Sequence, residues 1–396
     1  MMRSWLILLL LVVSFIAKGQ QQDSTFTKKA VKSTQYEFLF SYYQQGGNHS
    51  AITGGTGTEE LKVFINKLNV THAIDSFNTI LIEAGVDMIS SASTDKIDFR
   101  LSSASAEDNR FWIAAGYQRG SKDKRQLFGL RPSLSMESDY FSWGLNGWWT
   151  KRNDLNNWRY GVNMQVFADD LRWGRLNAEY KRPVTVVYPV ELRDSVWFDI
   201  YMRYTANIDF DIQHDINRRM SIGFFPGIIF QSGLLSTPFH RFYFAGATKA
   251  VVENLPQQRV KIPLGIQLNT FIGARMVLQL YYRYYWDNYG INGHTINLET
   301  PIKIIPQLTI VPFARLYSQK GAKYFFPNKT ANTTEAYFTS DYDLSRFTSF
   351  KYGAGIRFSS VRETFFRQIS LRYAHYSRSD GLYFNQLSSY FNMIGK

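Results

Sequence analysis

The sequence predicts an all-β protein, a single transmembrane antiparallel up-and-down β-barrel of about sixteen strands that follows a cleaved signal peptide. Three observations lead to this fold class. An apolar run follows a basic residue at the N-terminus, apolar and polar residues alternate along most of the 396-residue chain, and long connections alternate with short ones. These features indicate export, β-strands, and a barrel with loops at one end and turns at the other.

The N-terminus has the parts of a secretory signal peptide. Arg3 precedes an apolar run from Trp5 to Ala17, and Ala17–Lys18–Gly19 forms a small-x-small end. The run is too short to span a bilayer stably as a helix. We therefore expect a signal peptide over 1–19, a short periplasmic segment over 20–35 and the barrel over 36–396.

The clearest strand lies at 274–287. Its even positions are apolar or aromatic, from Met276 to Trp286, and its odd positions include polar residues from Gln279 to Asp287. Successive side chains of a strand point to opposite faces, so one face would contact lipid and the other the barrel interior. The same alternation occurs at 37–43, 79–88, 295–317 and 349–358.

Long polar segments alternate with short turns as the connections between successive strands. The long segments are 46–57, 91–108, 169–195, 232–256 and 320–345. Short turns are expected near Asp75–Ser76 and at 120–124, 152–155, 214–217, 272–273 and 305–306. Treating 169–195 as a loop preserves both the alternation and an even strand count. A soluble β-sandwich is disfavoured because the polar face is too charged for a dry core.

Composition excludes several kinds of site. The chain has no cysteine, so it has neither disulfides nor thiol chemistry, and its six histidines show no metal-ligand spacing. No metal and no cofactor is predicted. The net charge of +13 comes from basic residues scattered along the strands. Such scatter argues against a nucleic-acid partner and favours anionic lipid, an anionic solute or an anion path.

One set of side chains is expected to line the lumen. In the clearest strands its cations outnumber the acids Asp287 and Glu299, which predicts anion selectivity if the lumen is open. Register predicts Arg283 opposite Thr295 and Arg315 opposite Asn297, with the two guanidinium groups at nearly one height. The alternative is that acidic residues on other strands pair with these cations and close the lumen. The expected lining set is Gln279, Tyr281, Arg283, Asp287, Asn297, Glu299, Lys303, Arg315, Tyr317, Lys351, Arg357 and Arg372.

The outward face suggests two further features near the loop ends. Tyr282, Tyr284 and Trp286 are expected in an aromatic girdle. His294 and Ser318 share the outward parity at headgroup depth, and Asn292 could orient the imidazole, which is the geometry that a membrane esterase needs. The simpler alternative, which we favour, is that these are interfacial polar residues that bind headgroups and water.

Several segments resemble an uncharacterised family of Gram-negative outer-membrane barrels, catalogued as domain of unknown function 3570. The most specific is "YYRYYWDNYGINGHTINLE" (281–299). The others are "GVDMISSAS" (85–93), "ESDYFS" (137–142), "SGLLSTPFHRFYF" (232–244), "FARLYSQKGAKYFF" (313–326) and "TSDYDLSRFTSFKYGAGIRF" (339–358). The resemblance implies a barrel in the outer membrane and no established activity. Family members are encoded near flavin-transfer and thiol-redox proteins, which hints at an envelope redox system.

Three hypotheses for function follow. The first is a diffusion channel for small, anionic solutes in the outer membrane of a Gram-negative bacterium. The second is a closed barrel that acts as a scaffold for an envelope protein partner, with a redox link. The third is an outer-membrane esterase or phospholipase that uses the lipid-facing His294–Ser318 pair. We do not expect an enzyme, and steady single-channel conductance would favour the first hypothesis.

Overall fold

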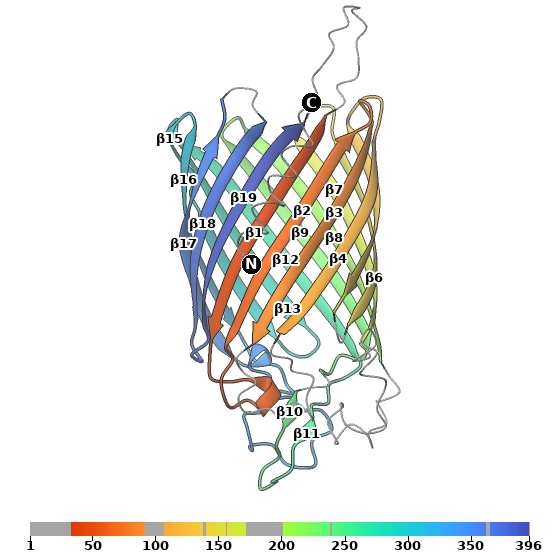
Figure 1. Cartoon of the computed structure of the whole chain (residues 1–396), viewed down its shortest axis with the longest axis vertical. Helices are drawn as coiled ribbons and strands as arrows, with labels where there is room; N and C mark the ends of the chain where they lie inside the picture. Colours follow the sequence, from red (N-terminus) through yellow and green to blue (C-terminus); the bar gives the residue numbers. More distant parts are fainter. Residues whose placement is uncertain are drawn as a thin grey trace, which may run out of the picture. The chain divides into compact units, whose positions relative to one another are not determined.

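The computed structural model describes residues 33–91, 107–137, 140–155, 157–171, 201–237, 240–361 and 365–395. Its 17 sheet segments form one closed antiparallel sheet. Segments β14 and β15 are two parts of one strand, because both pair with β13 on one side and β16 on the other. The barrel therefore has 16 strands, as predicted (Figure 1).

The strands have the length of tilted membrane crossings. Their bounds are β1 Thr34–Gly46, β2 Leu61–Ala73, β3 Asn78–Ser91, β4 Glu107–Gly120, β5 Gln126–Met136, β6 Phe141–Arg152, β7 Trp158–Asp170, β8 Met202–Asn217, β9 Met220–Gly233, β12 Gln258–Ile272, β13 Met276–Asp287, β14 Asn292–Glu299, β15 Ile302–Ile305, β16 Leu308–Gln319, β17 Phe347–Ser359, β18 Phe366–Arg378 and β19 Tyr383–Gly395.

The first and last strands close the barrel. β1 pairs with β19 from Thr34↔Gly395 to Gly46↔Tyr383, and with β2 on its other edge. No free edge then remains in the sheet, so the ladder satisfies the backbone groups that lipid cannot. Among the described residues, no helix is long and apolar enough to cross a membrane.

The outer face carries a broad belt of exposed apolar side chains. On β4 Phe111 and Ile113 are 50% and 52% exposed, and on β16 and β17 Leu316 and Ile356 are each 54% exposed. Similar residues recur on nearly every strand. A soluble surface does not carry a continuous apolar belt of this extent, whereas a membrane barrel requires one.

The inner face is polar and charged. Ion pairs between strands that are not neighbours in the sheet show this. Arg131 on β5 pairs with Glu83 on β3 at 2.9 Å, and Arg372 on β18 pairs with Glu299 on β14 at 2.9 Å. Side chains reach over intervening strands only on the concave side of a closed sheet. A polar inner face of this kind is typical of outer-membrane barrels.

The connections follow the predicted order, with small differences in bounds. The five long segments fall between β1 and β2, β3 and β4, β7 and β8, β9 and β12, and β16 and β17. The turn predicted at 214–217 is wrong in position, because β8 continues to Asn217 and the turn is 218–219. Of the segment 169–195, the first two residues end β7 and 172–195 lie outside the described residues. The expected signal peptide also lies outside them.

The two faces of β13 should respond differently to a buried charge. Leu280 is 39% exposed on the outer face, and Gln279 has the opposite parity. We expect Leu280→Arg to lower the free energy of unfolding by about 2–4 kcal/mol, because a charge at the bilayer midplane on the lipid face is costly. Gln279→Arg should change it by less than about 1 kcal/mol. Denaturant unfolding in micelles measures both, and equal losses would contradict the assignment of the faces.

Candidate functional site

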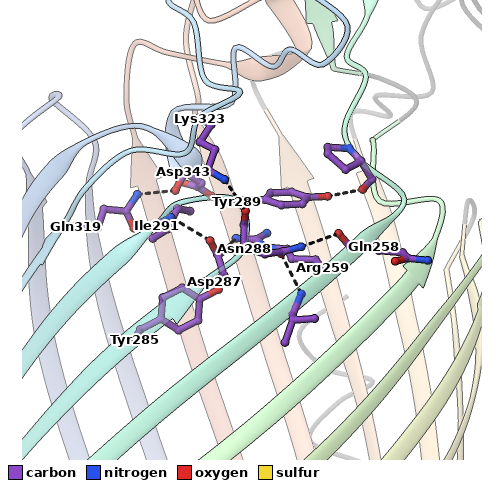
Figure 2. A network of polar contacts seen from close by, with 12 residues as sticks. Gln258, Arg259, Tyr285, Asp287, Asn288, Tyr289, Ile291, Gln319, Lys323 and Asp343 are labelled. Atoms are coloured by element: carbon purple, nitrogen blue, oxygen red, sulfur yellow. Dashed lines mark hydrogen bonds and ion pairs between the residues drawn. The ribbon is translucent and has the colours of Figure 1, made fainter.

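The side chain of Asp287 is the centre of a polar network at the end of β13 (Figure 2). It is fully buried and accepts hydrogen bonds from Arg259 Nε at 3.0 Å, the Tyr285 hydroxyl at 2.9 Å and the Ile291 amide at 3.0 Å. Arg259 Nη2 completes the ion pair. A buried carboxylate is stable only with partners of this kind, so Asp287 fixes the start of β12 to the turn after β13.

The turn itself depends on Gly290. Its φ of 96° lies in the left-handed region that favours glycine, and a Cβ there would lie 2.9 Å from Lys323 Cγ. This tight turn directs the Tyr289 ring inward, where it is 1% exposed. The Arg259 guanidinium lies over the ring, 4.5 Å from its centroid.

Contacts from this turn hold two long loops. The Tyr289 hydroxyl donates to the carbonyl of Pro256, and the Lys323 amide donates to the carbonyl of Tyr289 at 2.8 Å. Tyr289, Ile291, Leu255 and Ala322 form a small buried core. The β9–β12 and β16–β17 loops are therefore packed against the barrel end, and we call the two together the cap.

The cap has internal structure of its own. β10 (Arg241–Phe242) pairs with β11 (Val251–Val252) beyond the end of the barrel (Figure 1). Phe338 packs on Phe242 and Phe244, with ring centroids 4.6 and 4.8 Å apart. The loop between β1 and β2 joins the cap through His49, whose ring stacks on Tyr342 at 3.9 Å.

Inside the cap, Glu253 is buried among ionisable groups. It accepts a hydrogen bond from the Thr339 hydroxyl at 2.6 Å, and His240 Nδ1 lies 3.3 Å from its Oε2. Burial alone would lower the pKa of His240, but Glu253 and Asp341 outweigh it and raise that pKa to about 9. Burial raises the pKa of Asp341 to about 6, although His240 opposes the shift. Burial, assisted by Asp343, raises the pKa of Glu59 to about 7.

The register predicted for the basic residues is confirmed. Arg283 pairs with Thr295, and Arg315 pairs with Asn297. Lys351 on β17 lies directly opposite Arg315, so two cations are adjacent on neighbouring strands. Aromatic and polar residues complete these two rows, namely Tyr281 opposite Asn297 and Tyr317 opposite Thr295. Nearer the turn end, Lys303 and Arg357 both lie opposite Thr309, and Gln279 lies opposite Glu299.

The two acidic residues among the expected lining residues form ion pairs with cations other than Arg283, Arg315 and Lys351. Asp287 binds Arg259 and is fully buried, so it does not border open space, and Glu299 binds Arg372. Within the described ranges, no carboxylate lies within ion-pair distance of Arg283, Arg315 or Lys351. Lys351 Nζ donates to Gln386 Oε1 at 3.2 Å, and Arg315 is exposed. The wall therefore keeps a local excess of positive charge.

On the outer face, Tyr282 and Trp286 are 38% and 37% exposed. His294 lies directly opposite Ser318 in the ladder, so the predicted shared parity of the two residues is confirmed. Its Nδ1 is 2.8 Å from the Tyr282 hydroxyl, whereas Asn292 accepts a hydrogen bond from Tyr284. Asn292 therefore does not orient the imidazole. In the described part of the chain, His294 and Ser318 are not hydrogen bonded to each other.

Sequence reasoning missed the residues that organise the cap. Arg259, Glu253 and His240 lie in or beside a loop, where side-chain periodicity gives no signal. A buried tyrosine in the turn, Tyr289, was also missed. The only indication in the sequence was the "DNYG" turn within the most specific motif.

We expect Asp287→Ala to destabilise the cap end. The substitution leaves the Arg259 charge unpaired beside a buried ring, which costs about 3–5 kcal/mol when a buried pair is broken. Denaturant unfolding in micelles measures the loss. Asp154→Ala is the matched control, because Asp154 is 86% exposed in its pair with Arg125 and should contribute less than about 1 kcal/mol. Similar values for the two variants would argue against a central role for Asp287.

The cap should loosen as pH rises. Glu59 contributes stability that is complete below its ordinary pKa of 4.5 and is lost as pH rises through about 7. The contribution of His240 is complete below 6.5 and is lost through about 9. Because the chain lacks cysteine, spin labels at Thr248→Cys and Asn332→Cys report the cap alone. Their distance distribution should broaden between pH 6 and pH 9.5. The midpoint of this broadening should lie roughly one pH unit lower in His240→Gln than in the control His214→Gln. An unchanged distribution would contradict this pH dependence.

Comparison with solved structures finds barrels of low similarity. The outer-membrane protein OpdK from Pseudomonas aeruginosa, in a structure with vanillate, is 8% identical with a TM-score of 0.40, and the match covers 92% of this chain and 98% of OpdK. A BenF-like porin from Pseudomonas fluorescens Pf-5 is 8% identical with a TM-score of 0.41, covering 94% and 100%. A bacterial polysaccharide outer membrane secretin is 9% identical with a TM-score of 0.46, covering 90% and 97%. These similarities carry no argument about solute or mechanism.

No curated protein matches the chain. Residues 198–388, from the end of the β7–β8 loop into β19, match a family model described as protein of unknown function (DUF3570). This range includes β13, the Asp287 turn, both cap loops and the basic wall. The predicted resemblance to this family is therefore confirmed over residues 198–388.

Proposed function

We propose that the protein is an outer-membrane diffusion channel for small anionic solutes, with an outer mouth narrowed by the cap. The observation that carries this proposal is the excess of positive charge on the inner wall. Arg283, Arg315 and Lys351 lie together on three strands and, among the described residues, have no carboxylate partner. Export by a cleaved signal peptide over 1–19 is part of the proposal.

A water-filled lumen best accounts for these side chains. Barrels of about 16 strands are wide enough to leave an aqueous channel. Adjacent unpaired cations such as Arg315 and Lys351 would be very costly in a dry interior, whereas water or a bound anion stabilises them. The expected lining residues other than Asp287 share this face of the sheet, because alternation along each strand is preserved.

The arrangement favours anions for two reasons. Like charges grouped in a constriction set the sign of the permeant ion. Arginine also binds carboxylate and phosphate groups in a bidentate manner. Tyr281 and Tyr317 lie in the same two rows and could contact an apolar part of a solute.

The packed cap supports a second candidate function. A small core around Tyr289 and an aromatic cluster around Phe338 hold the loops over the barrel end. If the cap closes the mouth completely, the barrel would serve as a scaffold with the cap as the surface for an envelope partner. Conductance distinguishes the candidates, because a scaffold of this kind would be silent in a planar bilayer.

We expect a steady pore whose reversal potential in a salt gradient shows preference for anions. Arg283→Ala, Arg315→Ala and Lys351→Ala together should lower the anion-to-cation permeability ratio by about tenfold, equal to roughly 1.4 kcal/mol. The control Lys122→Ala with Arg218→Ala removes exposed charge from two turns and should change the ratio by less than about twofold. Cation preference in the unmodified protein would overturn the proposed solute class, and silence would favour the scaffold.

A further inference from the structure

A groove of about 480 Å³ crosses the outer face of β14, β16, β17 and β18 near the cap end. Its outward-facing lining includes His294, Ser318, Thr348, Ser377 and Ser379. Most of the lining residues have the parity opposite to that of Arg283 and Arg315, so the groove lies mainly on the outer face. Tyr317, Ser349 and Arg378, which have the inward parity, also line it. Neither the channel nor the scaffold function uses it.

The groove has a row of hydroxyl groups at one height. His294 lies opposite Ser318, and Ser318 lies opposite Thr348. The Thr348 amide donates to Ser379 Oγ at 3.1 Å, which extends the row to the turn after β18. Four adjacent positions therefore present polar groups next to the apolar belt of the outer face.

Apolar side chains form the next row toward the membrane centre. Ile296, Leu316 and Phe350 lie opposite one another and are 47%, 54% and 39% exposed. Two residues along a strand span about 7 Å, so this row lies one step deeper than the hydroxyl row. The depression arises because small side chains at Ser318, Thr348 and Ser377 lie among the larger rings of His294 and Phe350.

Two basic residues lie on the opposite side of the hydroxyl row, two residues further from the membrane centre. Lys320 follows β16, Arg346 precedes β17, and both are exposed. The Lys320 amide donates to the Asn292 carbonyl at 2.8 Å, which continues the ladder, so alternation from Ser318 places Lys320 on the outward side. Arg346 is two residues before Thr348, on the cap side of the hydroxyl row. In the part of the chain that the structure describes, neither forms an ion pair with a carboxylate. Their charge is therefore available to an anion at the membrane surface.

We propose that the groove binds one lipid molecule of the surrounding leaflet. The headgroup of this lipid is rich in hydroxyl groups and carries phosphate. The basic, hydroxyl and apolar rows match the order of groups along such a lipid, which are the phosphate, the headgroup hydroxyls and the acyl chain. Lys320 and Arg346 contact phosphate, Ser318 and Thr348 hydrogen bond the headgroup, and Leu316 and Phe350 contact an acyl chain. The lipid-facing position commits the site to a membrane lipid and not to a soluble anion.

The probe is diphosphoryl lipid A, titrated into the delipidated full-length protein in dodecyl maltoside and followed by native mass spectrometry. We expect saturable binding of one molecule that millimolar inorganic phosphate does not displace. Lys320→Ala with Arg346→Ala should weaken binding by about tenfold. Ser318→Leu with Thr348→Leu fills the groove and should abolish binding.

Controls separate the groove from general charge effects. Lys122→Ala with Arg218→Ala removes the same charge from turns at the other end of the strands and should change the dissociation constant by less than about twofold. Heat-modifiability on gels verifies that each variant is folded. Unsaturable binding, displacement by inorganic phosphate, or equal affinity in the groove variants and the controls would overturn the proposal. Release of fatty acid that Ser318→Ala abolishes would also overturn it, in favour of an esterase.

Discussion

Barrel closure between β1 and β19 is the constraint on which the rest of this structure depends. Lipid offers no hydrogen bonds, so a sheet within a membrane must leave no edge. The ladder from Thr34↔Gly395 to Gly46↔Tyr383 meets that requirement. Once the sheet is closed, alternation along each strand separates a lipid-facing surface from an interior, and every polar residue on the inward parity becomes part of one wall.

The closed sheet also determines which distant residues meet. Glu299 and Arg372 are separated by two strands, and they pair because the wall is concave. Asp287 is paired with Arg259 on the neighbouring strand. These pairings leave the positive charge of Arg283, Arg315 and Lys351 uncompensated locally, which is the basis of the proposed anion path.

At the loop end of the barrel, strand β13 also positions the cap. Asp287 ends β13, and the turn after it holds the cap through Tyr289 and the Lys323 amide. Strand β14 then returns with His294 on the outer face. One motif therefore contributes to the wall, the cap and the lipid-facing groove, which gives its mixture of aromatic and charged residues a physical cause. Tyr282, Tyr284 and Trp286 have the outward parity, and Tyr289 packs in the turn. Tyr281 and Tyr285 share the inward parity of Arg283 and Asp287.

The fold and the register could be predicted from the sequence, because side-chain alternation has a period of two and short turns transmit that parity from one strand to the next. Arg283 opposite Thr295 and Arg315 opposite Asn297 followed from counting alone. The turn at 218–219 was misplaced by a few residues, because polar residues also occur at the end of β8. Ion pairing and the cap were decided only by tertiary structure. Periodicity assigns Arg259 and Glu253 no partner, since contacts across a closed sheet and between loops depend on which segments come together in space.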